Sequence, residues 1–488
     1  MTKKSAVILS SAVLLLAGAA LAVKRLPTNR AQAKEVPPVN PGGACTGGKS
    51  LPHRSQADVG FGQMKAALSG SKLLHRANAE AYVAVEIAAR PAVRREARPP
   101  ARVVLVIDRS GSMAGEKLQR AQESAKGIVD RLDAGDRVGI VQYDDTVQVL
   151  AHPTRLDEGG RARLRTIIDR ISSGGSTNLH GGLVTGLAEL SQDAGGINRL
   201  ILLSDGQANA GVVDPAAIAA TARQAAEQGR RITTIGMGVD YNEDLMEAIA
   251  ESGRGQYHYV RDAEGLAKVF AQELEALQGT VATSVELVLE PACAGVEIVD
   301  VYGYEWRRQG AQIVVPMADF YGSENRRLTA KLRVSAGESG SADVLRVRFS
   351  HRDPGGARVD QSSLALGVEL TANAALAEAS VEKPVLASVL EVQSGNAMRL
   401  AAAEYQKGNR AQAQNVLRTQ QAQLQEQGKR YALPQAAIQQ PLNELAKQSA
   451  DTDLFAPDSF MGKNVIKDRK SSARRYGKVS SYNDSFKF

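Results

Sequence analysis

One short segment of the 488-residue sequence gathers side chains that could do chemistry: Asp108, Ser110 and Ser112 form the pattern D-x-S-x-S. The segment ends an apolar run, VVLVID, which is typical of a strand buried on both faces. Thr177, in GGSTNLH, precedes a helical stretch, and Asp205, in LLSDG, ends another apolar run. Open parallel sheets bind ligands beyond the carboxyl ends of their strands, so we expect these five side chains to meet at one edge.

An oxygen-only set of this kind suits a hard divalent cation. Mg²⁺ prefers six oxygen ligands at about 2.0–2.1 Å and keeps several waters, so it needs few direct protein ligands. A zinc site would require cysteine or histidine, and the six histidines and two cysteines form no H-E-x-x-H or C-x-x-C motif. The plainer alternative is that Asp108 caps a helix and the two serines shape a turn.

Other kinds of site find no support in the sequence. No predicted strand leads into a G-x-x-x-x-G-K-[ST] loop, and no G-x-G-x-x-G motif is present, so nucleotide binding has no support. The residues around Ser112 miss the G-x-S-x-G pattern by one position. His180 lies close to Thr177 but is interpreted as structural. Aromatic residues make up 4% of the chain, and most of the +7 charge comes from residues 462–488, so we predict no nucleic-acid partner.

The elements around these residues alternate between apolar runs and amphipathic stretches. The runs lie at 103–108, 138–143, 200–205 and 232–239, and the helical stretches at 117–132, 179–190, 215–228, 242–251 and 262–277. This alternation predicts an α/β fold with a doubly wound, mostly parallel sheet. The run at 146–152 follows its neighbour after a tight turn, which predicts an antiparallel edge strand.

With these elements placed, residues 101–278 resemble the von Willebrand factor type A domain, which is shared with the inserted domains of integrins. The metal-ion-dependent adhesion site of that family combines D-x-S-x-S with a threonine and an aspartate on two later loops. The matching residues here are Asp108, Ser110, Ser112, Thr177 and Asp205. The resemblance implies Mg²⁺ or Mn²⁺ held by the three hydroxyls, with both aspartates nearby, often through water. It also implies a coordination position for a partner's carboxylate.

Composition divides the rest of the chain. Residues 1–22 have the lysines, apolar run and small residues of a signal peptide, with an uncleaved membrane anchor as the alternative. We expect a flexible linker (23–75), a strand and connector that joins the β-rich domain (76–100), the α/β domain (101–279), an antiparallel β-sandwich-like domain (280–372), a helical segment (373–450) and a basic disordered tail (451–488). Cys45 and Cys293 form either a disulfide or two free thiols.

These features predict an exported protein, periplasmic, secreted or on the cell surface, that acts in adhesion or assembly and is not an enzyme. Its partner is a protein that offers an Asp or Glu to the metal. One alternative is a scaffold in which the β and helical parts carry the contacts and the metal is structural. Another is a metal-assisted hydrolase, which needs a general base besides Asp108 and Asp205. The basic tail is expected to be solvated, with weak contact to a membrane or anionic polymer as the alternative.

Overall fold

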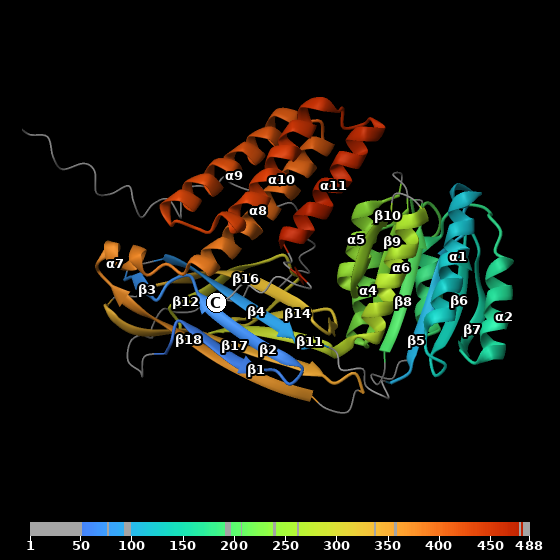
Figure 1. Cartoon of the computed structure of the whole chain (residues 1–488), viewed down its shortest axis with the longest axis horizontal. Coiled ribbons are helices and arrows are strands. Elements are labelled where there is room, and N and C mark those ends of the chain that lie inside the picture. The colour runs from blue at the N-terminus through green and yellow to red at the C-terminus, as the bar shows by residue number, and fades with distance from the viewer. Residues whose placement is uncertain are drawn as a thin grey trace, which may run out of the picture.

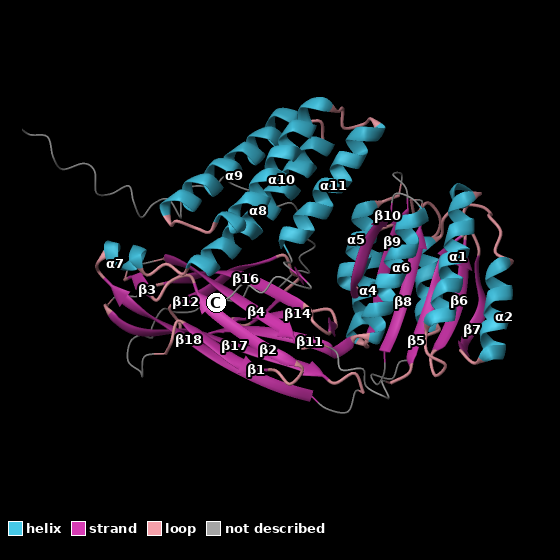
Figure 2. Cartoon of the chain, in the orientation of Figure 1, coloured by secondary structure: helices cyan, strands magenta, loops and turns pink. Residues whose placement is uncertain are grey.

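The computed structural model describes residues 51–75, 78–91, 99–190, 197–205, 207–237, 241–260, 263–335, 338–355, 359–477 and 480–481. They form an α/β domain, a β-rich unit of two sheets and a bundle of helices (Figures 1 and 2). The expected signal peptide lies outside the described residues, as does Cys45. Cys293 is disulfide-bonded, and Cys45 is the only other cysteine of the sequence. None of the described helices is long and apolar enough to cross a membrane.

A six-stranded sheet forms the centre of the α/β domain, in the order β10-β9-β8-β5-β6-β7. Its strands are β5 (Ala101–Asp108), β6 (Arg137–Tyr143), β7 (Val147–Arg155), β8 (Ile197–Ser204), β9 (Arg230–Met237) and β10 (Arg254–Val260). Neighbouring strands pair in parallel, except that β7 is antiparallel to β6 at one edge. The sequence therefore predicted the fold class and the antiparallel edge correctly, and β10 is an additional strand that it did not predict.

Helices cover both faces of this sheet. One face carries α1 (Glu116–Arg131), α2 (Glu158–Asp169) and α6 (Ala263–Gln278), and the other α3 (Leu179–Ala188), α4 (Pro215–Glu227) and α5 (Glu243–Ser252). Side chains alternate along a strand, so each central strand supplies both cores. In β5, Val103 and Leu105 pack with the first set of helices, and Val104 and Val106 pack with the second. This two-sided burial explains the uninterrupted apolar runs.

The β-rich unit consists of two mostly antiparallel sheets that share one hydrophobic core. The first contains β1 (Arg54–Asp58), β2 (Gly62–Leu68), β4 (Ala79–Ala89), β16 (Asn325–Val334), β12 (Val296–Tyr302) and β19 (Ser480–Ser481). The second contains β13 (Arg307–Gln309), β14 (Gln312–Pro316), β11 (Thr280–Pro291), β17 (Gly340–Arg352), β18 (Val359–Thr371), β3 (Lys72–Leu74) and β15 (Phe320–Tyr321). Because β4 pairs along its length with β16, the α/β domain is inserted between two strands of this unit.

The expectation of a flexible linker over residues 23–75 is wrong for the part that the structure describes. Strands β1, β2 and β3 lie within that range, and β2 pairs antiparallel with β4. Met64, Ala66 and Leu68 are buried on one side of β2. Small alanines and neighbouring glycines weaken the alternation in the sequence, and the pairing partner β4 supplies the order that local composition does not indicate.

The C-terminal helices form a bundle with its own core. They are α7 (Ala374–Ala379), α8 (Lys383–Gln406), α9 (Arg410–Arg430), α10 (Gln435–Leu454) and α11 (Phe460–Gly477). Val385 and Val389 of α8 pack onto Ala67, Tyr82 and Ala84 of the first sheet. The expectation of a disordered tail from residue 451 is wrong over α11, because Val465, Ile466 and Ala473 are buried in the bundle core.

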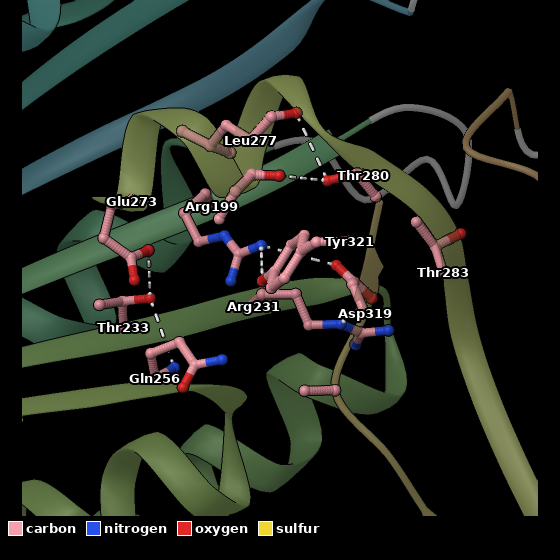
Figure 3. A network of polar contacts seen from close by, with 12 residues as sticks. Arg199, Arg231, Thr233, Gln256, Glu273, Leu277, Thr280, Thr283, Asp319 and Tyr321 are labelled. Atoms are coloured by element: carbon pink, nitrogen blue, oxygen red, sulfur yellow. Dashed lines mark hydrogen bonds and ion pairs between the residues drawn. The ribbon is translucent and has the colours of Figure 1, made fainter. Parts of the chain in front are cut away.

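A buried set of charges joins the α/β domain to the β-rich unit (Figure 3). Arg231 of β9 pairs through Nε with Oδ1 of Asp319 at 2.9 Å, and Arg199 of β8 lies 3.7 Å from Oδ2 of the same carboxylate. Arg199 also donates to the Tyr321 hydroxyl at 3.2 Å. All of these side chains are almost completely buried. Both arginines lie near the N-terminal ends of their strands, whereas the D-x-S-x-S loop follows the C-terminal end of β5. The junction and that loop therefore lie at opposite ends of the parallel strands.

Candidate functional site

Asp108 is the fully buried last residue of β5, and both of its carboxylate oxygens accept hydrogen bonds. Oδ1 accepts from the backbone N–H of Ser110 at 2.8 Å, and Oδ2 accepts from the Ser204 hydroxyl at 2.7 Å. Burial raises the pKa of Asp108 and the negative charge of Asp205 adds to this, although the hydrogen bonds from the two serines oppose the shift. Two acidic groups are therefore held close together in a poorly solvated place.

Ser112 connects the D-x-S-x-S loop to Asp205, which follows β8. Its hydroxyl donates to Asp205 Oδ1 at 2.7 Å and lies 3.3 Å from the Ser110 hydroxyl. The Asp205 side chain is buried, and Lys117 of α1 contacts its other oxygen, Oδ2. The structure thus brings Asp108, Ser110, Ser112 and Asp205 into one set of contacts.

Thr177 lies in a loop that runs beside the D-x-S-x-S loop, at the same ends of the strands. The Gly111 N–H donates to the Gly175 carbonyl at 3.0 Å, and the Gly174 N–H donates to the Arg109 carbonyl at 2.6 Å. The loop before α3 therefore runs directly beside the D-x-S-x-S loop. Thr177 itself is 3% exposed.

The loop after β8 holds Thr177 from the other side. The Thr177 N–H donates to Asn209 Oδ1 at 2.8 Å, and the Thr177 carbonyl accepts from the N–H groups of Asn209 and Ala210. An added Cβ on Gly211 would lie 2.4 Å from the Asn178 side chain, so the two loops are closely packed. Asn178 caps α3 by accepting from the Gly181 N–H.

A supporting residue that sequence reasoning missed is Asp144, which directly follows β6. It pairs with Arg109 at 2.6 Å and accepts from Thr146 and from the Gly175 N–H. Burial works against its charge, but the hydrogen bonds and Arg109 outweigh burial and lower the pKa of Asp144. Its position at a strand end was a usable signal. Its role was hidden because Arg109 and Gly175 are its neighbours only in the fold.

The donor set fits a hard cation and not a zinc ion. Within the described residues, no group of three or more His, Cys, Asp or Glu side chains is arranged to hold a metal. The candidate site instead contains hydroxyl groups next to two carboxylates. Such oxygen ligands are the ones that Mg²⁺ and Mn²⁺ prefer. His180 is not part of this set, since its Nε2 lies 3.2 Å from the Thr221 hydroxyl of α4 and burial lowers its pKa.

A family model, the von Willebrand factor type A domain, matches residues 103–272. This part of the chain is a von Willebrand factor type A domain. Two solved structures share the fold over most of the chain. One is a von Willebrand factor type A protein from Catenulispora acidiphila, with a TM-score of 0.66 and 17% identity over 87% of this chain and 97% of that one.

The second structure is the ArnB paralog VWA2 from Sulfolobus acidocaldarius, with a TM-score of 0.57 and 17% identity over 86% of this chain and 99% of that one. At such identities the likeness establishes the fold alone. Because it extends well beyond residues 103–272, the combination of this domain with the surrounding strands and helices occurs in other proteins too.

Three proteins of similar sequence each match part of this chain. The uncharacterized protein YfbK of Escherichia coli is 33% identical over 44% of this chain and 38% of its own length. The uncharacterized protein sll0103 of Synechocystis is 25% identical over 66% of this chain and 78% of its own length. The inter-alpha-trypsin inhibitor heavy chain H1 of Sus scrofa is 33% identical over 32% of this chain, but this chain spans only 18% of it.

Proposed function

We propose that this protein is a metal-dependent protein-binding module whose von Willebrand factor type A domain docks a carboxylate of a partner protein. The observation that carries the proposal is the hydrogen bond from Ser112 to Asp205, two residues that are 93 positions apart in the chain. It joins the D-x-S-x-S loop to the end of a second strand at the sheet edge where open α/β sheets bind ligands.

In this proposal the hydroxyls of Ser110, Ser112 and Thr177 hold Mg²⁺ or Mn²⁺. A bound ion would supply a strong positive charge with a place for one oxygen of a partner's Asp or Glu. Asp108 and Asp205 orient the hydroxyls: the Ser112 hydroxyl donates its hydrogen to Asp205, which leaves its lone pairs for the ion. Asp108 fixes the loop through the Ser110 N–H.

The test combines metal binding with partner capture by the intact protein. We expect isothermal titration calorimetry to detect Mg²⁺ or Mn²⁺ uptake, and Ser112→Ala to weaken it at least tenfold. Ser173→Ala is the matched control, because Ser173 is an exposed serine of the neighbouring loop outside the motif. Partner capture should require the metal and be abolished by EDTA and by Ser112→Ala. Full capture under both treatments would reject the proposal.

We further propose that the site binds without catalysing a reaction. A metal-assisted hydrolase needs a general base near the ion. Asp108 and Asp205 already accept hydrogen bonds within the site, and His180 is turned toward Thr221. Metal-dependent turnover of a phosphate or ester substrate, lost in Ser112→Ala, would contradict this.

We also propose that the protein is exported. The support is the pattern of residues 1–22 and the disulfide bond of Cys293, since disulfides persist in oxidising compartments. Cell fractionation should find the protein outside the cytoplasm. A cytoplasmic protein with Cys293 as a free thiol would contradict the proposal.

A further inference from the structure

A cavity of about 440 Å³ lies between the α/β domain and the β-rich unit, away from the candidate metal site. One wall is formed by the end of α4, the end of α5 and the start of β10, and the other by the segments around β13, β14 and the start of β16. In Figure 1, α4, α5 and β10 form the side of the α/β domain that faces the β-rich unit. Pockets for small molecules measure roughly 300–1,000 Å³ and occur preferentially between domains.

Arg254 lines this cavity in an unusual backbone conformation. Its φ is +50°, in the left-handed region that non-glycine residues seldom adopt. The pairing of β10 with β9 is interrupted by a bulge between Arg254 and Tyr257. Bulges re-aim side chains and are frequent beside binding sites, and backbone outliers gather at such sites as well. An added Cβ on Gly255 would lie 2.1 Å from the Ile232 carbonyl, so the chain is closely held here.

Among the residues that the structure describes, no acidic side chain is in contact with the Arg254 guanidinium. Within the described part of the chain it forms no hydrogen bond or ion pair, although it is half-buried. Burial lowers the pKa of Arg254 to about 10, and the positive charges of Arg231 and Arg307 add to this more than Glu227 and Glu286 offset it. The charge is therefore poorly stabilised where it lies.

Other arginines on the cavity wall have carboxylates beside them. Arg307 pairs with Glu286 at 2.9 Å, and Arg326 pairs with Glu324 at 2.7 Å. Arg223 lies 3.9 Å from Glu305. Arg254 is thus the cation of the cavity that an incoming negative group would stabilise most.

Besides its arginines, the cavity is lined by aromatic side chains and by five glutamates, Glu227, Glu247, Glu251, Glu305 and Glu324. Tyr257, Tyr304 and Trp306 line the cavity. The Arg308 guanidinium lies 5.8 Å from the centre of the Trp306 ring and is itself anchored to the Ile298 carbonyl at 2.8 Å. The indole is therefore held in place by a neighbour, which suits it to receive a planar group.

We propose that this cavity is a second binding site, which takes a small organic anion with its carboxylate or phosphate on Arg254 and its planar body against Trp306 and Tyr304. The site is independent of the metal edge. It lies where the two units meet, so its ligand contacts residues of both.

Trp306 provides a direct readout, because it is the only tryptophan of the sequence. The intact protein is titrated with benzoate, phenyl phosphate, inorganic phosphate and the neutral benzyl alcohol while tryptophan fluorescence is recorded. We expect benzoate or phenyl phosphate to change the fluorescence saturably, and benzyl alcohol and inorganic phosphate to bind at least tenfold more weakly. The two anions distinguish a carboxylate from a phosphate ligand.

Arg254→Met should weaken binding of the preferred anion at least tenfold, and Arg254→Lys, which keeps the charge, should weaken it less. The matched control is Arg120→Met, on an exposed arginine of α1. Thermal unfolding checks the fold of each variant, and the anion should raise the melting temperature of the wild type but not of Arg254→Met. No saturable response to either aromatic anion, equal binding by Arg254→Met, or equal binding of inorganic phosphate would overturn the proposal.

Discussion

Lys117 places a positive charge at the candidate metal site. Its ammonium contacts Oδ2 of Asp205 and lies 3.3 Å from the Ser112 carbonyl. The Asp205 side chain is fully buried, whereas 43% of the Lys117 side chain is exposed. A buried carboxylate without a counter-charge is costly, so Lys117 stabilises the form of the protein without metal. The same ammonium would repel a divalent cation.

We therefore predict opposite effects of Lys117→Met on stability and on metal binding. Without metal the melting temperature should fall, because Asp205 loses its counter-charge. Mg²⁺ binding should tighten roughly tenfold, equivalent to about 1.4 kcal/mol, in calorimetric titrations. Lys126→Met, which breaks the surface pair with Asp169, should change neither. Weaker Mg²⁺ binding would mean that Lys117 instead positions Asp205.

Gly174 is required by the space around it. An added Cβ would lie 2.1 Å from Asp144 Oδ2 and 2.9 Å from an Arg109 nitrogen. Gly174→Ala should lower the free energy of unfolding by about 1–3 kcal/mol in urea titrations and weaken metal binding, because the loop that carries Thr177 must shift. Gly127→Ala is the control: α1 leaves open space there, so this change should stabilise by up to about 1 kcal/mol.

The sequence was sufficient to select the candidate residues that the structure brings to one place, but not the residues that hold them there. D-x-S-x-S, the threonine before a helix and the aspartate at a strand end all follow from local pattern alone. Lys117, Ser204 and Asn209 were missed because each acts on a residue that is distant in the chain. No local spacing identifies Ser204 as the donor to Asp108.

At the scale of single elements, α11 shows why composition misled. Its sequence, FMGKNVIKDRKSSARRYG, is rich in basic residues, which is typical of a solvated segment. In the structure, Lys467 lies over the Tyr241 ring at 3.5 Å and the Arg469 guanidinium over the Tyr405 ring at 4.5 Å. Arg469 also donates to the Gln448 carbonyl. The local composition predicts that these basic side chains are solvated. In the fold they pack instead against aromatic rings and helix carbonyls of other elements.

Helix α8 carries a carboxyl group whose charge is disfavoured. Burial raises the pKa of Glu391 to about 7, although Arg327 of β16, 3.3 Å away, opposes the shift. The folded pKa exceeds the ordinary value of 4.5, so the folded state binds a proton that the unfolded state has lost. Stability should therefore fall as pH rises from about 4.5 to 7 and stay lower above this range.

Glu391→Gln should remove this loss. We predict a gain in the free energy of unfolding of up to about 3 kcal/mol at pH 8 and little change at pH 4.5, measured in urea titrations at both values. Glu426→Gln, on an exposed residue of α9, is the control and should leave the pH dependence unchanged. An equal effect of Glu391→Gln at both pH values would show that the carboxyl group does not titrate in this range.

At the scale of the whole molecule, the junction in Figure 3 makes the α/β domain and the β-rich unit depend on each other. Asp319 is the carboxylate that faces both Arg231 and Arg199. Glu273 of α6 lies behind them and bonds to Thr233 and His258 at 2.9 and 2.8 Å. Burial opposes the charge of Glu273, but His258 and Arg199 keep its pKa below the ordinary value. Replacing Asp319 should therefore lower the stability of both the α/β domain and the β-rich unit.

Asp319→Asn should destabilise the protein by about 3–5 kcal/mol, because two buried guanidinium groups lose their common counter-charge. Urea unfolding with probes in each unit should also show that the two transitions separate. The control is Asp130→Asn, which removes a surface pair with Arg165 and should cost less than about 1 kcal/mol. A small effect of Asp319→Asn would show that the junction does not couple the units.

The insertion of the α/β domain into the β-rich unit has a consequence for the order in which a newly made chain acquires its structure. Asn325 of β16 bonds to Glu86 of β4, a residue that leaves the ribosome 239 residues earlier. The doubly wound domain can form as soon as its own residues emerge, while β2 and β4 still lack the strand that completes their sheet. Nascent chains that end before β16 should therefore expose an apolar strand edge and be held by chaperones until translation has passed it.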